Sequence, residues 1–256
     1  MSEKKLAGKV IVVSGGTKGV GKAAAEEFAR LGANVIISGR DEETARKSIR
    51  LMRTYDSEGT FVYTDLHDIS SCSTPFDVAY QKYGRVDGFF NYAGVTYFSP
   101  LDKCDERTFD EIMDINFKAC FFCCQHAIKY MRMSGGGSIV ITGSPHAWSG
   151  EGDRCTYACS KGALLTLVEH IAHHYSKEQI RCNLLTLGWT PTEGEVELRK
   201  SQGMTEAELR DYASSFIPMG RMSERSDYLD ALVYLMSDGS KMTTGSNLRI
   251  TGGLYM

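Results

Sequence analysis

Short runs of apolar residues alternate along the chain with longer segments in which apolar residues recur every three or four positions. The runs are almost continuously apolar, which is typical of strands in a parallel sheet that helices cover on both faces. The longer segments, such as the one containing Ala23, Phe28 and Leu31, have helical spacing. We predict seven strands, at Val10–Val13, Asn34–Ile37, Thr60–Tyr63, Val86–Phe90, Ser138–Ile141, Arg181–Leu185 and Asn247–Ile250.

This alternation predicts the fold class. Strands and helices that follow one another with right-handed crossovers form a doubly wound, Rossmann-like α/β/α sandwich around a mainly parallel, seven-stranded sheet. Neither a repeat nor a linker rich in Pro and Ser divides the 256 residues, so we predict a single domain over residues 1–256. The one long region without a strand, residues 193–225, is polar and charged, and we predict a helical excursion over the site there.

Composition narrows the class of protein. The chain is 42% hydrophobic and 24% charged, with a net charge of −3 and no basic stripe, which argues against a nucleic-acid partner. No apolar run approaches the roughly 18 residues of a membrane span, and the first residues do not resemble a signal peptide. We therefore expect a cytoplasmic protein that binds neither nucleic acid nor membrane.

The eight cysteines do not suggest disulfides or a metal site. They are scattered along the chain, and the C-x-x-C formed by Cys120 and Cys123 lies in a strongly apolar stretch that reads as a buried helix. Small buried thiols in a reducing compartment explain them better. We predict no metal.

A glycine-rich loop follows the first predicted strand directly and precedes a helix. Glycines at such a junction allow a tight turn and bring backbone N–H groups against a pyrophosphate. The loop lacks the Gly-Lys-Ser/Thr ending of an ATP-binding P-loop, so we predict a dinucleotide. The binding residues that we assign to it are Gly15, Thr17, Lys18, Gly19, Val20 and Gly21.

The end of the second predicted strand bears on which dinucleotide binds. NAD-binding proteins usually place an acid there for the ribose 2′-hydroxyl, whereas this strand ends Ser38-Gly39-Arg40. Arg40 can hold a 2′-phosphate by two charge-assisted hydrogen bonds, and Lys18 can approach from the glycine loop. We therefore predict NADP(H) in preference to NAD(H). The alternative is that Arg40 only caps a surface turn and that Lys18 is solvated.

Three residues carry candidate chemistry. Ser144 ends the fifth predicted strand, at the carboxyl edge of the sheet where ligands bind. Tyr157 and Lys161 follow in a helical stretch, four positions apart and therefore on one face of the helix.

Together these motifs resemble the short-chain dehydrogenase/reductase family over essentially the whole chain. The resemblance rests on Tyr157-x-x-x-Lys161, the serine thirteen residues before the tyrosine, the glycine loop and Asn91-Tyr-Ala-Gly94 after the fourth strand. It implies an oxidoreductase that interconverts a secondary alcohol and a ketone or aldehyde, with Tyr157 as general acid/base. Lys161 and the nicotinamide ring would favour the phenolate, and Ser144 would hold the substrate oxygen. Asn116 matches a residue that positions a water near Lys161.

The resemblance also implies further cofactor contacts. These are Asp65, Leu66, Asn91, Ala93, Gly94, Gly188 and Thr192, together with Ser38, Arg40, Tyr157 and Lys161. One motif departs from the family, because Leu187-Gly188 replaces Pro-Gly and Pro191 precedes Thr192. The family's pattern therefore carries over least well to the path of this loop beside the nicotinamide.

Aromatic and hydrogen-bonding residues near the candidate centre predict a polar substrate such as a sugar, polyol or hydroxy-acid derivative. We assign Ser144, His146, Trp148, Tyr157, Trp189 and Glu193 to the substrate wall, with Tyr97, Phe98, Glu151, Asp153 and Arg154 as further candidates. The alternative is that the histidine and the tryptophans only pack.

Two other functions remain open at this point. A nucleotide-sensing binding protein could use the same fold, although the Tyr–Lys pair is present here. A nucleotide-sugar epimerase or dehydratase normally has a larger C-terminal domain than the 60 or so residues that follow Thr192. We also expect a homo-oligomer, a tetramer or dimer. Four apolar residues of the helix that contains Tyr157 are available for a partner helix, although burial in the chain's own core explains some of them equally well: Leu164, Leu167, Val168 and Ile171.

Overall fold

The computed structural model describes residues 4–255 and contains one seven-stranded sheet in which every pairing is parallel. The strand order is β3-β2-β1-β4-β5-β6-β7, so the direction of winding reverses between β1 and β4. The doubly wound sheet predicted from the alternating pattern is confirmed. The strands are β1 (Val10–Ser14), β2 (Asn34–Gly39), β3 (Gly59–Tyr63), β4 (Gly88–Asn91), β5 (Gly137–Gly143), β6 (Ile180–Leu187) and β7 (Asn247–Ile250).

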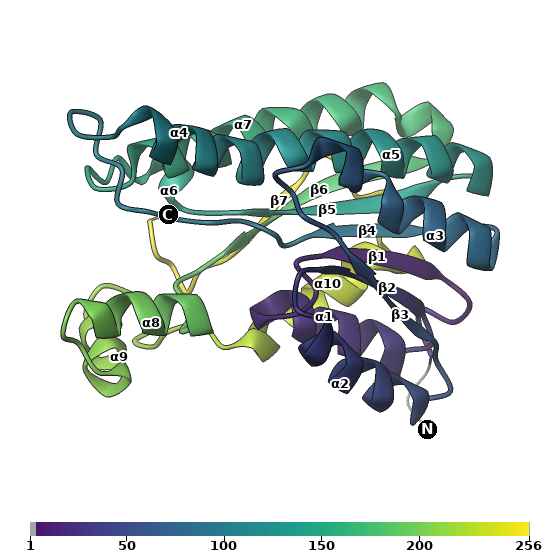
Figure 1. The fold of residues 1–256 in the computed structure, drawn as a ribbon, viewed down its shortest axis with the longest axis horizontal. Helices are drawn as coiled ribbons and strands as arrows, with labels where there is room; N and C mark the ends of the chain where they lie inside the picture. Colours follow the sequence, from purple (N-terminus) through teal and green to yellow (C-terminus); the bar gives the residue numbers. More distant parts are fainter. Residues whose placement is uncertain (1–3, 256) are drawn as a thin grey trace.

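Helices cover both faces of the sheet (Figure 1). On one face lie α3 (Thr74–Tyr83), α5 (Ala119–Ser134) and α7 (Cys155–His174), and on the other α1 (Gly19–Arg30), α2 (Glu42–Arg53) and α10 (Leu229–Met236). Successive residues of β1 contribute to the two apolar layers in turn. Val10 and Val12 pack in the layer with α3 and α5, whereas Ile11 and Val13 pack in the layer with α1 and α10. Period-two alternation of buried side chains thus builds two apolar layers from one sheet.

The edge strands differ from the prediction that all strands are covered on both faces. In β3 the side chain of Tyr63 is 61% exposed, and in β7 Leu248 is 36% exposed. Both strands lie at the ends of the sheet order, where a neighbouring strand covers only one side. The central strands β1 and β4 are buried throughout.

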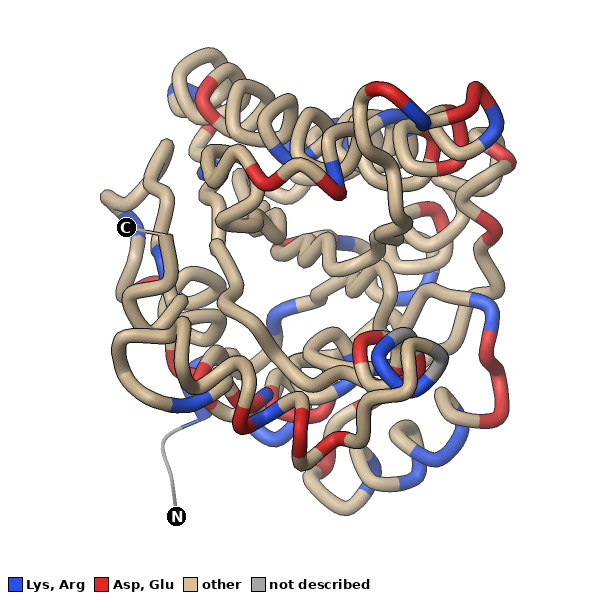
Figure 2. Tube along the Cα trace, turned by 90° about the vertical axis from the view of Figure 1, so that its left-hand side faces the viewer, with Lys and Arg blue, Asp and Glu red and all other residues tan. Residues whose placement is uncertain are grey.

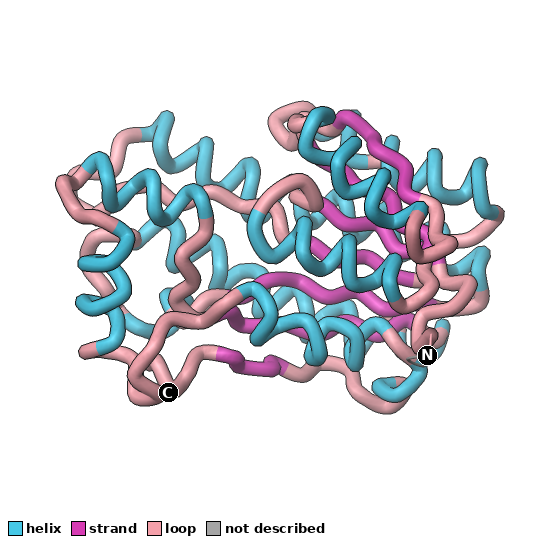
Figure 3. Tube along the Cα trace, turned by 90° about the horizontal axis from the view of Figure 1, so that it is seen from below, coloured by secondary structure: helices cyan, strands magenta, loops and turns pink. Residues whose placement is uncertain are grey.

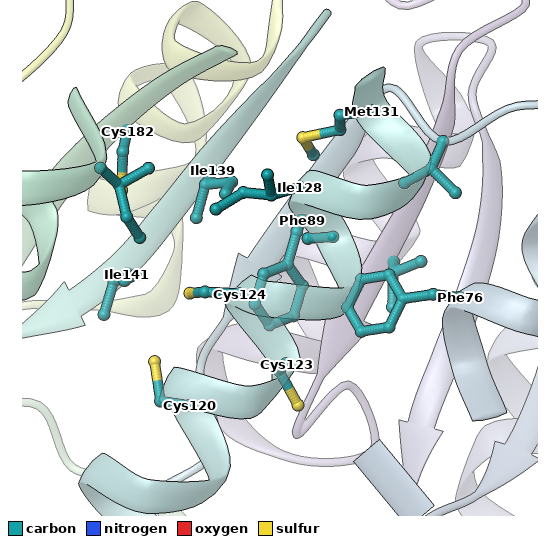
Figure 4. Close-up of a cluster of buried hydrophobic side chains, with 14 of the residues drawn as sticks. Phe76, Phe89, Cys120, Cys123, Cys124, Ile128, Met131, Ile139, Ile141 and Cys182 are labelled. Carbon is teal, nitrogen blue, oxygen red and sulfur yellow. The ribbon is translucent and has the colours of Figure 1, made fainter. Parts of the chain in front are cut away.

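The apolar layer between α5 and the sheet contains a group of cysteine thiols. Cys120, Cys123 and Cys124 of α5 lie with Cys182 of β6 among apolar side chains (Figure 4). All eight cysteines are unpaired, and the four in this group are buried. They act as small apolar residues, as the sequence predicted.

Of the two explanations for the apolar residues of α7, a partner helix or the chain's own core, the structure shows the second. Leu164, Leu167, Val168 and Ile171 belong to the core between α7 and the sheet. The reason is that α7 crosses the sheet directly and contacts β6 along its length. The exposed apolar side chains on this side of the molecule lie elsewhere, for example Phe109 and Phe121.

Smaller elements gather beyond one end of the strands. They are α4 (Glu106–Met113), α6 (His146–Ser149), α8 (Glu193–Ser201) and α9 (Glu206–Ser214), and the chain ends there as well (Figures 1 and 3). Side-chain caps begin α8 and α9, because Thr192 accepts from the N–H of Glu195 and Thr205 forms a capping box with Glu208. Region 193–225 therefore contains two short capped helices, and their apolar core is separate from the two sheet layers.

Acidic and basic positions are interspersed over the helices (Figure 2). Many of them pair one helical turn apart, as Glu42 does with Arg46 and Asp114 with Lys118. Within residues 4–255 no helix is long and apolar enough to cross a membrane.

Candidate active site

One large cavity lies at the carboxyl ends of the strands, with α8, α9 and the C-terminal tail across from them. Its volume is about 810 Å³, within the range of ordinary ligand sites. Most of the predicted site residues line it: Gly15, Thr17, Lys18, Val20, Ser38, Arg40, Asp65, Leu66, Ala93, Gly94, Ser144, His146, Tyr157, Lys161, Gly188, Trp189 and Thr192. Outside its lining lie Gly19, Gly21, Asn91, Asn116, Trp148 and Glu193.

The three candidate catalytic side chains line this one cavity. Ser144 follows β5 directly, and Tyr157 and Lys161 occupy successive turns at the start of α7. The ammonium of Lys161 lies 5.7 Å from the centre of the Tyr157 ring and donates to the carbonyl of Thr142 at 3.0 Å. Lys161 is only 4% exposed, so its charge acts in a site with little water.

Asn116 supports this centre from behind rather than lining the cavity. It lies in a π-helical segment, Asp114–Lys118, inserted between α4 and α5. Its side chain donates to the carbonyl of Val95 at 2.9 Å and to the hydroxyl of Ser160 at 3.1 Å, and accepts from the N–H of Val95 at 2.7 Å. The amide thus ties the loop after β4 to α7. The water-positioning role remains a prediction.

The glycine loop fits a pyrophosphate. Helix α1 begins at Gly19 without a side-chain cap, which leaves its first N–H groups available to an anion. The hydroxyl of Ser14, at the floor of the loop, is buried and has no hydrogen-bond partner among the described residues. An unpaired buried polar atom beside free N–H groups is what a missing polar ligand would satisfy.

Tyr92 is a part of this loop region that sequence reasoning missed. Gly19 has φ +54°, and a Cβ there would lie 2.5 Å from the Tyr92 hydroxyl oxygen. Burial raises the pKa of Tyr92 to about 12, so the phenol stays neutral beneath α1. Gly19 and Gly21 therefore make room for Tyr92, while their neighbours Thr17, Lys18 and Val20 line the cavity. The motif Asn91-Tyr-Ala-Gly94 was the available signal.

The far end of the cavity has the features expected of a 2′-phosphate site. A Cβ at Gly39 would lie 3.1 Å from the Thr17 side chain, so there is little room for an acid at this position. Arg40 and Lys18 line the cavity here and both are exposed. Within residues 4–255, Arg40 forms neither a hydrogen bond nor an ion pair, which leaves its guanidinium available to a ligand.

A histidine that sequence reasoning did not identify joins Asp65 at this end. His67 Nδ1 lies 2.8 Å from Asp65, and Nε2 lies 2.9 Å from Glu111 of α4. The hydrogen bonds to Asp65 and then to Glu111 raise the pKa of His67. His67 thus links the loop after β3 to α4 across the rim of the cavity.

The altered loop after β6 is held by hydrogen bonds of its own. The Thr190 hydroxyl lies 2.6 Å from that of Tyr228 and donates to the carbonyl of Gly188 at 3.1 Å. Thr192 lines the cavity and also caps α8. Both Gly188 and Thr192 therefore border the cavity despite the changed motif, and their contacts with a cofactor remain predictions.

Two of the predicted substrate residues do not face the cavity. Trp148 turns toward the C-terminal tail, where its Nε1 donates to the carbonyl of Tyr255 at 2.7 Å and its ring stacks on Arg249 at 4.4 Å. Glu193 is exposed and binds Arg225 at 2.7 Å, in a separate crevice between α8 and α9. The structure therefore corrects both assignments, because each side chain has a partner outside the cavity.

The substrate end includes rim residues that lie far apart in sequence. Glu195 accepts from Trp189 Nε1 and from Arg199 Nε, both at 2.9 Å, and the Arg199 guanidinium lies over the Trp189 ring. Leu254 and Tyr255 bring the C-terminal tail to the cavity. Of the further candidates, Tyr97, Glu151, Asp153 and Arg154 line the cavity, whereas Phe98 is 70% exposed outside it.

In the described part of the chain, no three His, Cys, Asp or Glu residues are arranged to hold a metal ion. His170, His173 and His174 lie exposed on α7, and the rings of His170 and His174 stack on one another.

Comparisons with known proteins identify the family. A family model described as enoyl-(acyl carrier protein) reductase matches residues 15–255. A short-chain alcohol dehydrogenase structure from Sinorhizobium meliloti superimposes with a TM-score of 0.90 at 26% identity, covering 98% of each chain. The chain belongs to the short-chain dehydrogenase/reductase family. It is an oxidoreductase of this family, whose members use NAD(H) or NADP(H).

Curated relatives match over almost the whole chain. An uncharacterised oxidoreductase of Thermotoga maritima is 32% identical, over 96% of this chain and 97% of its own. A 7alpha-hydroxysteroid dehydrogenase of Clostridium sardiniense is 31% identical (99% and 95%), and an L-rhamnose-1-dehydrogenase of Scheffersomyces stipitis is 30% identical (98% and 97%). An actinorhodin polyketide ketoreductase solved with NADPH shares the fold, with a TM-score of 0.90 at 22% identity over 100% of this chain and 99% of that one.

Proposed function

We propose that this short-chain dehydrogenase/reductase is an NADP(H)-dependent enzyme that interconverts a secondary alcohol and a ketone or aldehyde. The observation that carries the proposal is the meeting of Ser144, Tyr157 and Lys161 in one cavity that also reaches Arg40. Relatives named for oxidising a steroid hydroxyl or a sugar hydroxyl support the reaction class.

NADP(H), when bound, supplies or accepts the hydride. Glycine loop N–H groups would hold its pyrophosphate, and Arg40 and Lys18 would hold the 2′-phosphate. Glycine at position 39, packed against Thr17, leaves that end without the carboxylate that an NAD-selective site would have.

Tyr157 donates a proton to the carbonyl oxygen during reduction and removes it from the alcohol during oxidation. Ser144 donates a hydrogen bond to the same oxygen and stabilises the charge that develops there. Lys161 contributes a buried positive charge close to the Tyr157 ring, where it stabilises the negative charge that develops on Tyr157 as the proton is transferred. Asn116 holds the loop after β4 against helix α7 by hydrogen bonds, which preserves the spacing of these groups.

The substrate end favours a polar ligand. Glu151, Arg154 and Arg199 line it together with the aromatic rings of Trp189 and Tyr212. Such a lining combines hydrogen-bonding groups with flat apolar surfaces, which suits hydroxylated molecules.

The test is oxidation of NADPH and of NADH by the purified protein with a panel of sugars, ketones and aldehydes, together with reduction of NADP+ and of NAD+ with a panel of polyols. We expect turnover with NADPH, greater efficiency than with NADH, and a preference for hydroxylated substrates. Binding of NADPH without turnover of any compound tested would instead support a nucleotide-sensing protein and refute the proposed enzymatic function.

A further inference from the structure

His146 lies beside the catalytic tyrosine and faces the cavity. It begins the short helix α6, two residues after Ser144, and its backbone N–H donates to the Ser144 hydroxyl at 3.3 Å. The His146 ring packs edge-on against the Tyr157 ring, with 5.7 Å between their centres. Any group that binds His146 is therefore close to the oxygen that binds Tyr157.

His146 is a neutral imidazole near physiological pH. Burial, and secondarily the charge of Arg154, lowers the pKa of His146 to about 4. A neutral imidazole has one nitrogen that donates and one that accepts, so the position of its single proton decides what it can bind.

Glu151 faces one of the two ring nitrogens. Its carboxylate oxygen lies 3.2 Å from His146 Nδ1. The angles fall outside hydrogen-bond geometry, so Nδ1 is buried without a hydrogen-bond partner among the described residues. A carboxylate at this distance favours the imidazole tautomer that carries its proton on Nδ1. Nε2 is then left as an acceptor for a ligand.

The C-terminal tail holds Glu151 in this place. The hydroxyl of Tyr255 donates to Glu151, and the carbonyl of Tyr255 accepts from Trp148 at 2.7 Å. The Trp148 ring is stacked in turn on Arg249. The tail therefore acts as a positioning element for His146, through Glu151.

We propose that His146 Nε2 accepts a hydrogen bond from a substrate hydroxyl on the carbon next to the reacting one. The substrates are then vicinal hydroxy ketones and the corresponding 1,2-diols. This inference rests on the proposed function, because it assumes that the reacting oxygen binds Tyr157 and Ser144. Oxygens on adjacent carbons are close enough together for two rings in contact to bind one each.

The charges around His146 favour a neutral hydroxylated ligand over an anion. Three carboxylates (Glu151, Asp153 and Glu195) and two guanidiniums (Arg154 and Arg199) line this end of the cavity. Arg199 is already bound to Glu195 at 2.9 Å, and Arg154 has Asp153 at 3.5 Å. Little positive charge therefore remains to hold an anionic substrate.

The test compares three ketones of similar shape: 2-hydroxy-, 2-methoxy- and 2-methylcyclohexanone. Only the first can donate a hydrogen bond to Nε2, and the methoxy compound has an oxygen that can only accept. We expect kcat/KM with NADPH to be about tenfold higher for the hydroxy ketone than for the methoxy ketone, as one well-placed hydrogen bond gives.

Variants separate this contact from the intrinsic reactivity of the ketones. His146→Phe keeps an aromatic ring against Tyr157 but has no hydrogen-bond acceptor. The ratio of kcat/KM for the hydroxy ketone to kcat/KM for the methoxy ketone should therefore fall to the ratio of their rates of uncatalysed reduction. His146→Gln retains an acceptor oxygen and should keep part of the preference. Tyr255→Phe, which releases Glu151, should lower the same ratio. His170→Phe makes the same substitution on the exposed face of α7 and should leave the ratio unchanged.

The outcomes distinguish the two levels of the account. Equal efficiency for the hydroxy and methoxy ketones in the wild type, or an unchanged ratio in His146→Phe and Tyr255→Phe, overturns the inference but leaves the proposed function intact. Failure to reduce any of the three ketones, or any other carbonyl compound, with either cofactor overturns both. If His146→Phe does not fold, the ratios of His146→Gln and Tyr255→Phe decide the matter.

Discussion

The floor and the rim of the cavity are built in different ways. The floor, defined as Ser144, Tyr157 and Lys161 with Asn116 behind them, stands on a central strand and on helical segments, and Lys161 and Asn116 bind backbone groups nearby. The rim, defined as Arg40, His67, Glu151, Trp189, Glu195 and Tyr255, consists of half-buried or exposed residues that mainly bind other side chains. The floor therefore suits chemistry that needs fixed distances, and the rim suits selection among ligands.

Loss of the proton donor on the floor should have the largest effect. Tyr157→Phe removes the hydroxyl and keeps the ring, so kcat/KM should fall by about 10³-fold, within the usual range for general acid catalysis. Steady-state kinetics measures this, while NADPH fluorescence checks that the variant still binds the cofactor. A loss of kcat/KM of less than about tenfold would show that Tyr157 is not the general acid.

A floor residue that never touches the ligand should instead affect stability. Asn116→Ala leaves the N–H and carbonyl of Val95 without their partner, and we expect the free energy of unfolding to fall by about 2 kcal/mol. Urea denaturation measures it. Asn34→Ala, which loses one hydrogen bond at the exposed start of β2, is the matched control and should cost less. Equal losses in the two variants would mean that Asn116 is no more important to the floor than a surface amide.

Rim residues at the nucleotide end should change affinity without changing the chemistry. Arg40→Ala should weaken NADPH binding by about tenfold or more and leave NADH binding nearly unchanged, because only NADPH carries the 2′-phosphate. Titration of cofactor fluorescence gives both dissociation constants. Arg46→Ala, which breaks an exposed ion pair on α2, should alter neither. Equal losses for the two cofactors would refute the 2′-phosphate assignment.

The smallest effect should come from His67 and should depend on pH. Hydrogen bonds to Asp65 and Glu111 raise the pKa of His67 above 6.5, the value of an unperturbed histidine. The two hydrogen bonds therefore stabilise the fold most fully below pH 6.5. That contribution is lost as the pH rises through the higher folded value. The residue is half exposed, so the gain is limited to about 0.5 kcal/mol. The free energies of unfolding of the wild type and of His67→Gln should differ more at pH 6 than at pH 9. A larger difference at pH 9 would contradict the assignment.

The difference between floor and rim also explains how far the sequence could predict the molecule. The apolar runs of the central strands and the four-residue spacing of Tyr157 and Lys161 are local signals, and the structure places both residues as predicted. The parallel sheet with helices on both faces follows from the alternation of strands and helices. These features depend on neighbours in sequence or on the general topology.

The rim depends on contacts that no local pattern encodes. Tyr255 meets Trp148 across 107 positions, and His67 meets Glu111 across 44. Trp148 was predicted to face the substrate because it follows Ser144 closely, yet one turn of α6 and the packing of the tail direct it to Arg249. Glu193 was misplaced for the same reason, since Arg225 becomes its neighbour only after the chain folds.

In the proposed reaction, hydride passes between NADP(H) and the substrate carbon in this cavity. The most direct measurement uses NADPH carrying deuterium at both C4 positions, with 2-hydroxycyclohexanone and purified protein, followed by mass spectrometry of the product. We expect cyclohexane-1,2-diol with one deuterium on the newly formed carbinol carbon, and no labelled product from Tyr157→Phe in the same time. Diol without deuterium at that carbon would contradict it.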